Sequence, residues 1–137
     1  GGLLYSSDHG ETWVETSQTI KRHGPTFRAP QLLVLRDGTV VALATWHVEK
    51  VGKGFPHLCA WISRDDGQTW SRPGFALDVA AYGYPGAVLL QDESILVSYC
   101  QSAKSPNRVY VMRIKVNAGR DGVEWLPIDT ALPVGDK

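Results

Sequence analysis

Short apolar runs separated by turn-forming residues dominate this chain. The run from Pro30 to Leu35 is followed by Asp37-Gly38 and then by a second apolar run. The same order returns 55 positions later, beginning at Pro85 and with Asp92 in the turn. An apolar strand, a tight Asp-containing turn and another apolar strand are typical of a β-hairpin. The sequence therefore predicts two equivalent hairpins within an all-β fold.

The other apolar segments extend this pattern along the chain. The connections between them are rich in Gly, Asp, Ser and Pro, as the turns of all-β proteins require. No segment has the periodicity of a convincing amphipathic helix. The expected strands are Leu3–Ser7, Val14–Gln18, Gln31–Leu35, Val40–Val48, Leu58–Ser63, Phe75–Val79, Ala87–Leu90, Ile95–Gln101, Arg108–Val116 and Glu124–Ile128.

An eight-residue pattern occurs twice between these strands, in the order S-x-D-x-G-x-T-W. An Asp carboxylate can accept hydrogen bonds from the N–H groups of its own turn, and Gly supplies a positive φ. The Thr hydroxyl can bond the backbone locally, while the Trp ring packs beside the turn. The pattern therefore predicts two structural turns. Their shared residues are Ser6, Asp8, Gly10, Thr12 and Trp13, and Ser63, Asp65, Gly67, Thr69 and Trp70.

The two turns resemble the Asp-box, or BNR repeat, of sialidases and related β-propellers. In that family the box joins the third and fourth strands of a blade, at the periphery and away from the substrate. The resemblance implies a partial β-propeller of about two and a half four-stranded antiparallel blades. A degenerate third box is expected at Asp121-Gly122 and Trp125, 55 positions after Asp66-Gly67 and Trp70.

We expect a single partial propeller domain over residues 1–137. Residues 1–24 would be the outer strands of an incomplete blade, 25–80 a complete blade, and 81–137 a second blade with the degenerate box. A closed propeller of six such units would need about 330 residues, because each blade is a four-stranded sheet. The chain is therefore interpreted as a piece of a longer propeller, or as a unit that self-associates to cover its outer sheets.

Composition and charge exclude several classes of function. The 14 basic and 14 acidic residues give a formal net charge of zero without a Lys/Arg run, which argues against nucleic acid as a partner. No stretch approaches the roughly 18 apolar residues of a membrane span. No Cys/His spacing resembles a zinc site, so neither a metal nor a cofactor is expected. Cys59 and Cys100 are expected to be free, buried thiols.

Two segments carry the candidate chemistry. Phe27-Arg28-Ala29-Pro30 resembles the Arg-Ile-Pro motif that opens an inner strand in sialidases. The resemblance implies that Arg28 grips the carboxylate of a sialic acid, which a planar guanidinium can do through two parallel hydrogen bonds. The alternative is a strand-start arginine paired with a neighbouring acid. Arg108, near the start of a later strand, is the candidate for a second substrate-binding arginine.

The second segment is Tyr82-Gly83-Tyr84-Pro85, eight positions ahead of the hairpin Asp92 when counted from Tyr84. It resembles the segment around the sialidase nucleophile, which implies Tyr84 as nucleophile and Tyr82 as a substrate-binding residue. A phenol suits this role because the carboxylate on the sugar would repel an anionic Asp or Glu. The segment departs from the family at Cys100, where a Glu is usual. The alternative is that Tyr82 and Tyr84 are aromatic side chains that line the central face of the propeller.

These resemblances predict a fragment of a sialidase-like glycoside hydrolase propeller, inactive alone, that takes an acidic glycan of sialic-acid type. Inactivity is expected because no acid/base Asp can be assigned. Glu49 and Glu93 are the candidate acids, and Glu93 falls in a predicted turn. The alternative is a non-catalytic module that binds glycans or proteins and self-assembles. The resemblance is compatible with a secreted or periplasmic location, which the sequence itself leaves open.

Overall fold

The computed structural model of the chain describes residues 4–15, 27–46, 57–71, 75–79, 81–101, 108–119 and 121–128. Within these ranges it has ten β-strands and no helix, so the expectation of an all-β protein is confirmed. The strands are β1 (Leu4–Tyr5), β2 (Val14–Glu15), β3 (Phe27–Val34), β4 (Val40–Trp46), β5 (His57–Ser63), β6 (Phe75–Val79), β7 (Ala81–Leu89), β8 (Ser94–Gln101), β9 (Arg108–Val116) and β10 (Val123–Leu126).

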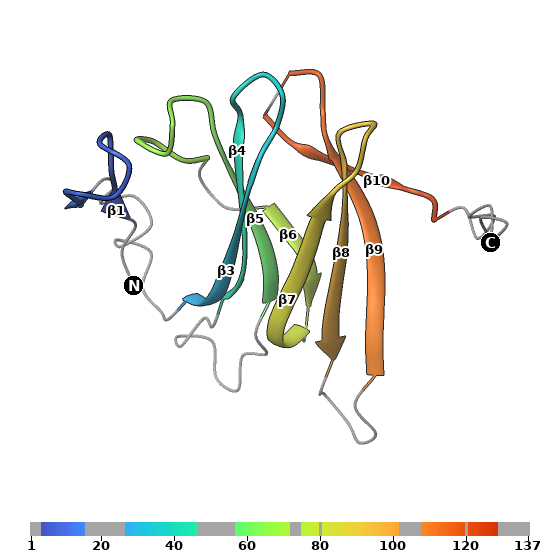
Figure 1. Cartoon of the computed structure of the whole chain (residues 1–137). Coiled ribbons are helices and arrows are strands. Elements are labelled where there is room, and N and C mark those ends of the chain that lie inside the picture. Colours follow the sequence, from blue (N-terminus) through green and yellow to red (C-terminus); the bar gives the residue numbers. More distant parts are fainter. Residues whose placement is uncertain are drawn as a thin grey trace, which may run out of the picture.

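Eight of these strands form two antiparallel four-stranded sheets (Figure 1). Sheet 1 has the order β3-β4-β5-β6 and sheet 2 the order β7-β8-β9-β10, so each strand pairs with its neighbour in sequence. The strands β1 and β2 form a separate two-stranded ribbon. In Figure 1 the turns that join β3 to β4 and β7 to β8 lie at the upper end of the sheets. The strands β3, β7 and β9 begin at the lower end.

The two sheets pack face to face around one hydrophobic core. The strand β7 lies against β3, β4 and β5 of sheet 1. Between the sheets, Leu43 and Leu58 of sheet 1 and Ile95 and Ile114 of sheet 2 are completely buried. Burying one such side chain is worth roughly 1.5–3 kcal/mol. The contact between the sheets is therefore a main source of stability.

The strand β5 is buried on both faces. Leu58, Ala60 and Ile62 belong to the core between the sheets, whereas Cys59 and Trp61 belong to a smaller cluster on the other side of sheet 1. A strand covered on both sides has no polar face, which explains the near-continuous apolar sequence of β5.

The turns that join β3 to β4 and β7 to β8 are built alike. Asp37 Oδ1 accepts a hydrogen bond from the N–H of Thr39 at 3.1 Å, and Asp92 Oδ1 accepts one from the N–H of Ser94 at 3.1 Å. The backbone hydrogen bond that closes each turn also matches. The N–H of Leu35 donates to the Thr39 carbonyl oxygen and that of Leu90 to the Ser94 carbonyl oxygen, both at 2.8 Å. Thr39 and Ser94 are therefore equivalent positions. The 55-residue repeat expected from the sequence is present in these turns.

The two sheets turn opposite faces toward each other. In the 55-residue repeat, Val41 corresponds to Leu96 and Ala42 to Val97. Sheet 1 turns Val41 toward sheet 2, but sheet 2 turns Val97, the counterpart of Ala42, toward sheet 1. We call the face that carries Val41 or Leu96 the leading face, and the face that carries Ala42 or Val97 the trailing face. The leading face of sheet 1 thus packs on the trailing face of sheet 2, which is a head-to-tail arrangement.

Strand register assigns the other residues to these faces. The leading face includes Val41, Leu43, Leu58, Ala60 and Ile62 in sheet 1, and Val88, Leu96, Ser98, Val109, Val111, Arg113, Lys115 and Glu124 in sheet 2. The trailing face comprises Leu32, Val34, Ala42, Ala44 and Trp61 in sheet 1, and Ala87, Leu89, Ile95, Val97 and Met112 in sheet 2.

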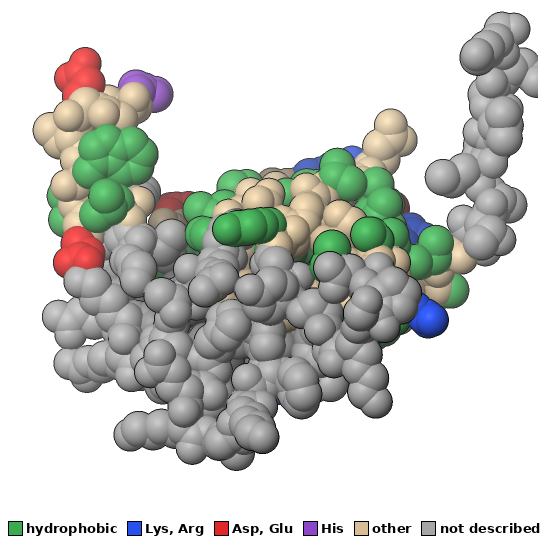
Figure 2. All heavy atoms as spheres, turned by 90° about the horizontal axis from the view of Figure 1, so that it is seen from below, with side chains coloured by type: hydrophobic (Ala, Val, Ile, Leu, Met, Phe, Trp, Pro, Cys, Tyr) green, Lys and Arg blue, Asp and Glu red, His purple; other side chains and the backbone are tan. Residues whose placement is uncertain are grey.

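The β1–β2 ribbon stands beside the two sheets in both views of the molecule (Figures 1 and 2). Its strands are two residues long, shorter in their described part than predicted, and residues 16–26 lie outside the description. Trp13, at the end of the first eight-residue turn, is 60% exposed, whereas its counterpart Trp70 is 7% exposed. The same turn sequence thus buries its Trp only where a four-stranded sheet lies beside it.

The turn between β9 and β10 occupies the place where a degenerate third box was expected. Asn117 Oδ1 accepts hydrogen bonds from the N–H groups of Asp121 at 3.1 Å and Gly122 at 3.3 Å, and the Asn117 amide donates to Asp121 at 2.8 Å. These bonds differ from those of the two eight-residue turns. Trp125 is 54% exposed, and Arg120 lies outside the described residues. One Asn side chain therefore organises this shorter turn.

Candidate functional site

The strands β3 and β7 each contain a bulge near the lower end. In β3 the pairing with β4 shifts between Arg28 and Gln31, and in β7 the pairing with β8 shifts between Tyr82 and Gly86. The two strands are in contact, so the bulged segments lie on neighbouring strands of the two sheets. Bulges redirect side chains and are over-represented beside active sites. This end of the molecule is therefore the candidate functional site.

Each bulge contains a proline, Pro30 in β3 and Pro85 in β7. Proline has no N–H to contribute to a ladder, and within sheets it is confined to edges, strand starts and bulges. The sequence predicts that both strands begin after these prolines, whereas β3 begins at Phe27 and β7 at Ala81. That prediction of the strand starts was wrong, because a bulge allows a strand to continue through a proline.

The residues predicted to bind substrate come from this lower end. Arg28 is the second residue of β3, and Tyr82 is the second residue of β7. Tyr84 lies within the β7 bulge and is 76% exposed. Arg108 opens β9 and is exposed. The side chains of Arg28 and Tyr82 lie outside the described part of the structure, so only their places on the strands are known.

The described part of the structure places neither candidate acid, Glu49 or Glu93, beside Tyr84. Glu49 lies outside the described residues. Glu93 lies at the upper end, in the turn between β7 and β8, where its carboxylate accepts a hydrogen bond from the N–H of Arg36 at 2.8 Å. No described carboxylate is hydrogen-bonded to the Tyr84 hydroxyl.

A polar cluster that was not predicted joins the two sheets near the lower end. The Tyr99 hydroxyl donates to Asp78 Oδ2, and Gln101 Nε2 donates to the same oxygen at 2.9 Å. The Tyr99 ring stacks on Tyr110 with centroids 5.7 Å apart and an interplanar angle of 23°. Asp78 belongs to β6 of sheet 1, and the other three residues belong to sheet 2. The signal in the sequence was the lone acid within the apolar segment Phe75–Val79.

This cluster holds Tyr99 as a neutral phenol. Burial raises the pKa of Tyr99, and the neighbouring Asp78 carboxylate raises it further because a phenolate would lie beside a negative charge. A neutral phenol donates a hydrogen bond but is a poor nucleophile near neutral pH. The Tyr99–Asp78 pair therefore fixes the two sheets relative to each other and does not supply a reactive phenolate.

The lower end also contains His57, the first residue of β5. Its Nδ1 atom is buried and has no hydrogen-bond partner among the described residues. The described part of the chain contains no group of three His, Cys, Asp or Glu side chains that could hold a metal ion. Both cysteines are free, as expected, although Cys59 is buried and Cys100 only half-buried.

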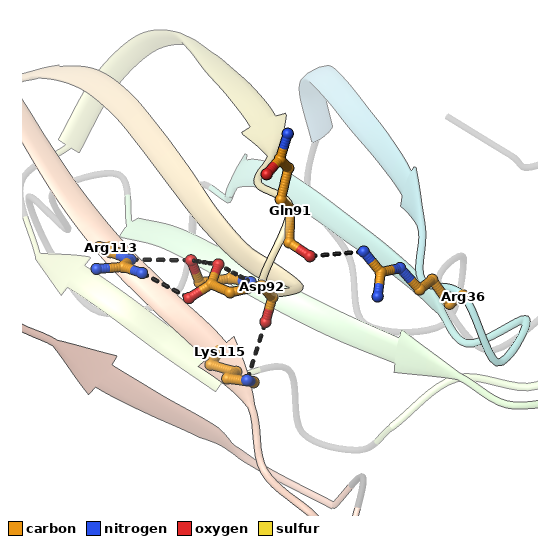
Figure 3. Close-up of polar contacts among 6 residues, drawn as sticks. Arg36, Gln91, Asp92, Arg113 and Lys115 are labelled. Carbon is orange, nitrogen blue, oxygen red and sulfur yellow. Dashed lines mark hydrogen bonds and ion pairs between the residues drawn. The ribbon is translucent and has the colours of Figure 1, made fainter. Parts of the chain in front are cut away.

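A second polar cluster ties the upper ends of the sheets together (Figure 3). The Arg36 guanidinium donates to the Gln91 carbonyl oxygen at 2.6 Å, which joins the β3–β4 turn to the β7–β8 turn. Within sheet 2, Asp92 forms an ion pair with Arg113 at 2.6 Å, and its carbonyl oxygen accepts from Lys115 Nζ at 2.9 Å. These groups satisfy one another, so the cluster fastens the turns.

The second eight-residue turn joins β5 to β6 at the upper end (Figure 1). The Asp65 carboxylate accepts from the N–H of Thr69 at 2.8 Å and from its hydroxyl at 2.5 Å. The N–H of Gly67 donates to Ser63 Oγ at 2.9 Å, and Trp70 Nε1 donates to the Gly67 carbonyl oxygen at 2.9 Å. Every shared residue of the pattern thus takes part in the turn.

The first eight-residue turn repeats these bonds. The N–H of Thr12 donates to Asp8 at 2.9 Å, that of Gly10 donates to Ser6 Oγ at 2.7 Å, and Trp13 Nε1 donates to the Gly10 carbonyl oxygen at 3.0 Å. The turn glycines have positive φ, 94° in the first turn and 83° in the second. The contacts are those expected from the residue types.

No protein-family model and no curated protein matches this chain. Within the described residues, no helix is long and apolar enough to cross a membrane. Function is therefore inferred from the residues at the lower end of the sheets.

Proposed function

We propose that this chain is part of a sialidase-like Asp-box propeller in which sheets 1 and 2 are consecutive blades. Two observations support this architecture. The eight-residue turns have matching hydrogen bonds, and the four-stranded sheets stack head-to-tail with a 55-residue repeat in their turns. In this arrangement β3 and β7 are the inner strands of the two blades.

The lower ends of β3 and β7 form the proposed binding edge for an acidic glycan of sialic-acid type. The observation that carries this proposal is the pair of bulges on neighbouring strands, one beginning at Arg28 and the other containing Tyr84. A guanidinium can bind a sugar carboxylate through two parallel hydrogen bonds. Tyr84 offers an exposed ring and hydroxyl, and Arg108 adds positive charge at the same end.

The chain by itself does not hydrolyse sialosides at a useful rate. A tyrosine nucleophile needs an adjacent base and a separate acid held in a narrow geometry. No described carboxylate is bonded to Tyr84, and Asp78 is already held by Tyr99 and Gln101. The remaining groups can bind a carboxylate but do not complete a hydrolytic site.

A non-catalytic module that binds glycans or proteins is the second candidate. It is favoured by the same lack of a described carboxylate on Tyr84. The two candidates differ in the behaviour of a complete propeller that contains these residues. A hydrolase would lose sialoside turnover on Tyr84→Phe, whereas a binding module would have no turnover to lose.

The purified chain tests the proposal in two assays, turnover of a fluorogenic sialoside and binding of free sialic acid followed by NMR. We expect no turnover and weak binding, which Arg28→Ala abolishes and Tyr84→Phe barely changes. Arg64→Ala, which removes an exposed arginine from the upper end, is the matched control and should leave binding intact. Binding that survives Arg28→Ala would refute the carboxylate clamp. Turnover that disappears in Tyr84→Phe would make the chain an active hydrolase.

A further inference from the structure

The leading face of sheet 2 is an apolar sheet surface with no sheet packed on it among the described residues. Val88, Val109 and Val111 on this face are 51%, 72% and 48% exposed. Three charged side chains of the described strands lie on the same face. Arg113 is paired with Asp92, Lys115 donates to the Asp92 carbonyl oxygen, and Glu124 lies opposite Lys115 on β10. These charges lie toward the upper end, so a partner that covers the three valines need not bury them, which would be costly.

The β3 edge of the trailing face of sheet 1 is the second such surface. Leu32 and Val34 at its inner edge are 52% and 61% exposed. Beside them, Ala42, Ala44 and Trp61 on β4 and β5 are buried, so the open part of this face is its β3 edge.

These two surfaces belong to the counterparts of the two faces that already meet inside the chain. Sheet 1 uses its leading face to bind the trailing face of sheet 2. The surfaces left open are the leading face of sheet 2 and the β3 edge of the trailing face of sheet 1, at Leu32 and Val34. A contact between different surfaces can be repeated by further copies, because each added copy presents the same free surface again.

We propose that a second copy of this chain docks through the trailing face of its sheet 1 onto the leading face of sheet 2. The contact would continue the head-to-tail order of the interface that the chain already contains, with one apolar sheet face on another. Because the formal net charge is zero, two copies do not repel each other as wholes. This association does not depend on sugar binding at the lower end.

Sedimentation velocity over a range of protein concentrations tests this interface. We expect the unmodified chain to associate as its concentration rises. Val111→Lys blocks the leading face of sheet 2, and Val34→Lys blocks the trailing face of sheet 1. Both positions are exposed, so the fold should be kept, which circular dichroism checks. Each variant alone should associate at least about tenfold more weakly, because a lysine would have to be desolvated in the contact.

Mixing the two variants separates head-to-tail association from every other mode. The Val111→Lys chain keeps a free trailing face and the Val34→Lys chain keeps a free leading face, so an equimolar mixture should form a dimer that stops at two chains. Val14→Lys, at a position 65% exposed on the β1–β2 ribbon, is the matched control and should associate like the unmodified chain. A chain that stays monomeric at all concentrations would overturn the proposal. A mixture that fails to dimerise, or a Val34→Lys variant that still associates alone, would also overturn it.

Discussion

The carboxylate of Asp65 accepts several of the hydrogen bonds that hold the second eight-residue turn together. It accepts hydrogen bonds from the N–H and the hydroxyl of Thr69 and from the hydroxyl of Ser63. The Thr69 hydroxyl is the main cause that lowers the pKa of Asp65, because these donors favour the charged form. Asp8 makes the same contacts with Thr12 and Ser6 in the first turn. The two turns therefore form a natural pair for comparison.

Asp65→Ala should destabilise the fold by roughly 1–3 kcal/mol, because the N–H and hydroxyl donors of the turn lose their acceptor. Asp8→Ala removes the same bonds from a turn whose Trp13 is exposed and lies outside the core, so global stability should change little. Urea denaturation of both variants measures the difference. Equal losses would contradict the view that the first turn lies outside the cooperative core. Sugar binding should be the same in both variants.

The ion pair at Asp92 predicts how stability depends on pH. The hydroxyl and N–H of Ser94, followed by Arg113, lower the pKa of Asp92 to about 2. A carboxyl whose pKa is lower in the folded state stabilises the fold above its unfolded pKa of about 3.9. This contribution is lost as the pH falls from about 4 to about 2. Urea denaturation from neutral pH down to about pH 2 measures this effect. Asp92→Asn should lower the free energy of unfolding at neutral pH, and that free energy should then fall less as the pH is lowered. An unchanged acid dependence would contradict the assignment.

At the scale of elements, the two equivalent turns differ at one informative position. The β3–β4 turn has Gly38 with a φ of +84°, and the β7–β8 turn has Glu93 at the equivalent place with a φ of +62°. A residue with a Cβ adopts this left-handed conformation at a cost of roughly 1–2 kcal/mol. The cost is offset here because the Glu93 carboxylate reaches the N–H of Arg36 in the other sheet. The strained residue thus helps to join the two turns.

Substitutions at this position separate the strain from the contact. Glu93→Ala keeps the strain and loses the bond to Arg36, so it should destabilise the fold by about 1 kcal/mol. Glu93→Gly loses the same bond but relieves the strain, so it should be more stable than Glu93→Ala by about 1 kcal/mol. Chemical denaturation measures both differences. As a control, Gly38→Ala should be destabilising, because it places a Cβ at a φ of +84°. If Glu93→Gly and Glu93→Ala are equally stable, the strain is not significant.

The sequence predicts the local features of these elements but not the contacts between distant strands. The repeated apolar runs and turn residues predicted the β-hairpins and the residues of both eight-residue turns, because those bonds are local. The predicted starts of β3 and β7 are too late, because a proline usually marks a strand boundary and Pro30 and Pro85 lie in bulges instead. The Asp78–Tyr99 contact was missed because it joins β6 to β8, and only the packing of the sheets brings those strands together. The predicted roles of Arg28 and Tyr84 stay predictions.

At the scale of the whole molecule, solvent access differs sharply between the two cysteines. Cys59 lies in the centre of sheet 1, and burial raises the pKa of its thiol to about 12. Cys100 lies near the end of β8 and is only half-buried. Reactivity of a thiol requires both access and the thiolate form. Cys59 is therefore shielded by the intact core, and its reaction reports the opening of the molecule.

In native buffer, a thiol reagent should label Cys100 quickly and Cys59 only at the rate at which the core opens. Denaturant should accelerate the labelling of Cys59 in parallel with global unfolding, because β5 is buried on both faces. Mass spectrometry of the Cys100→Ser chain isolates this reaction, and Cys59→Ser is the matched control. Rapid labelling of Cys59 without denaturant would mean that sheet 1 opens separately from the rest of the core.

Head-to-tail packing of the two sheets also limits how a chain of this kind can evolve. A duplication of one 55-residue unit would insert a sheet between two existing ones, and both new junctions would be of a kind that the chain already contains. Loss of one unit would rejoin the neighbours in the same way. Insertions of intermediate length would leave an unpaired strand edge and an uncovered face. Lineages that carry this architecture should therefore differ in length by whole sheets, and each step adds or removes one bulged strand start at the edge proposed to bind sugar.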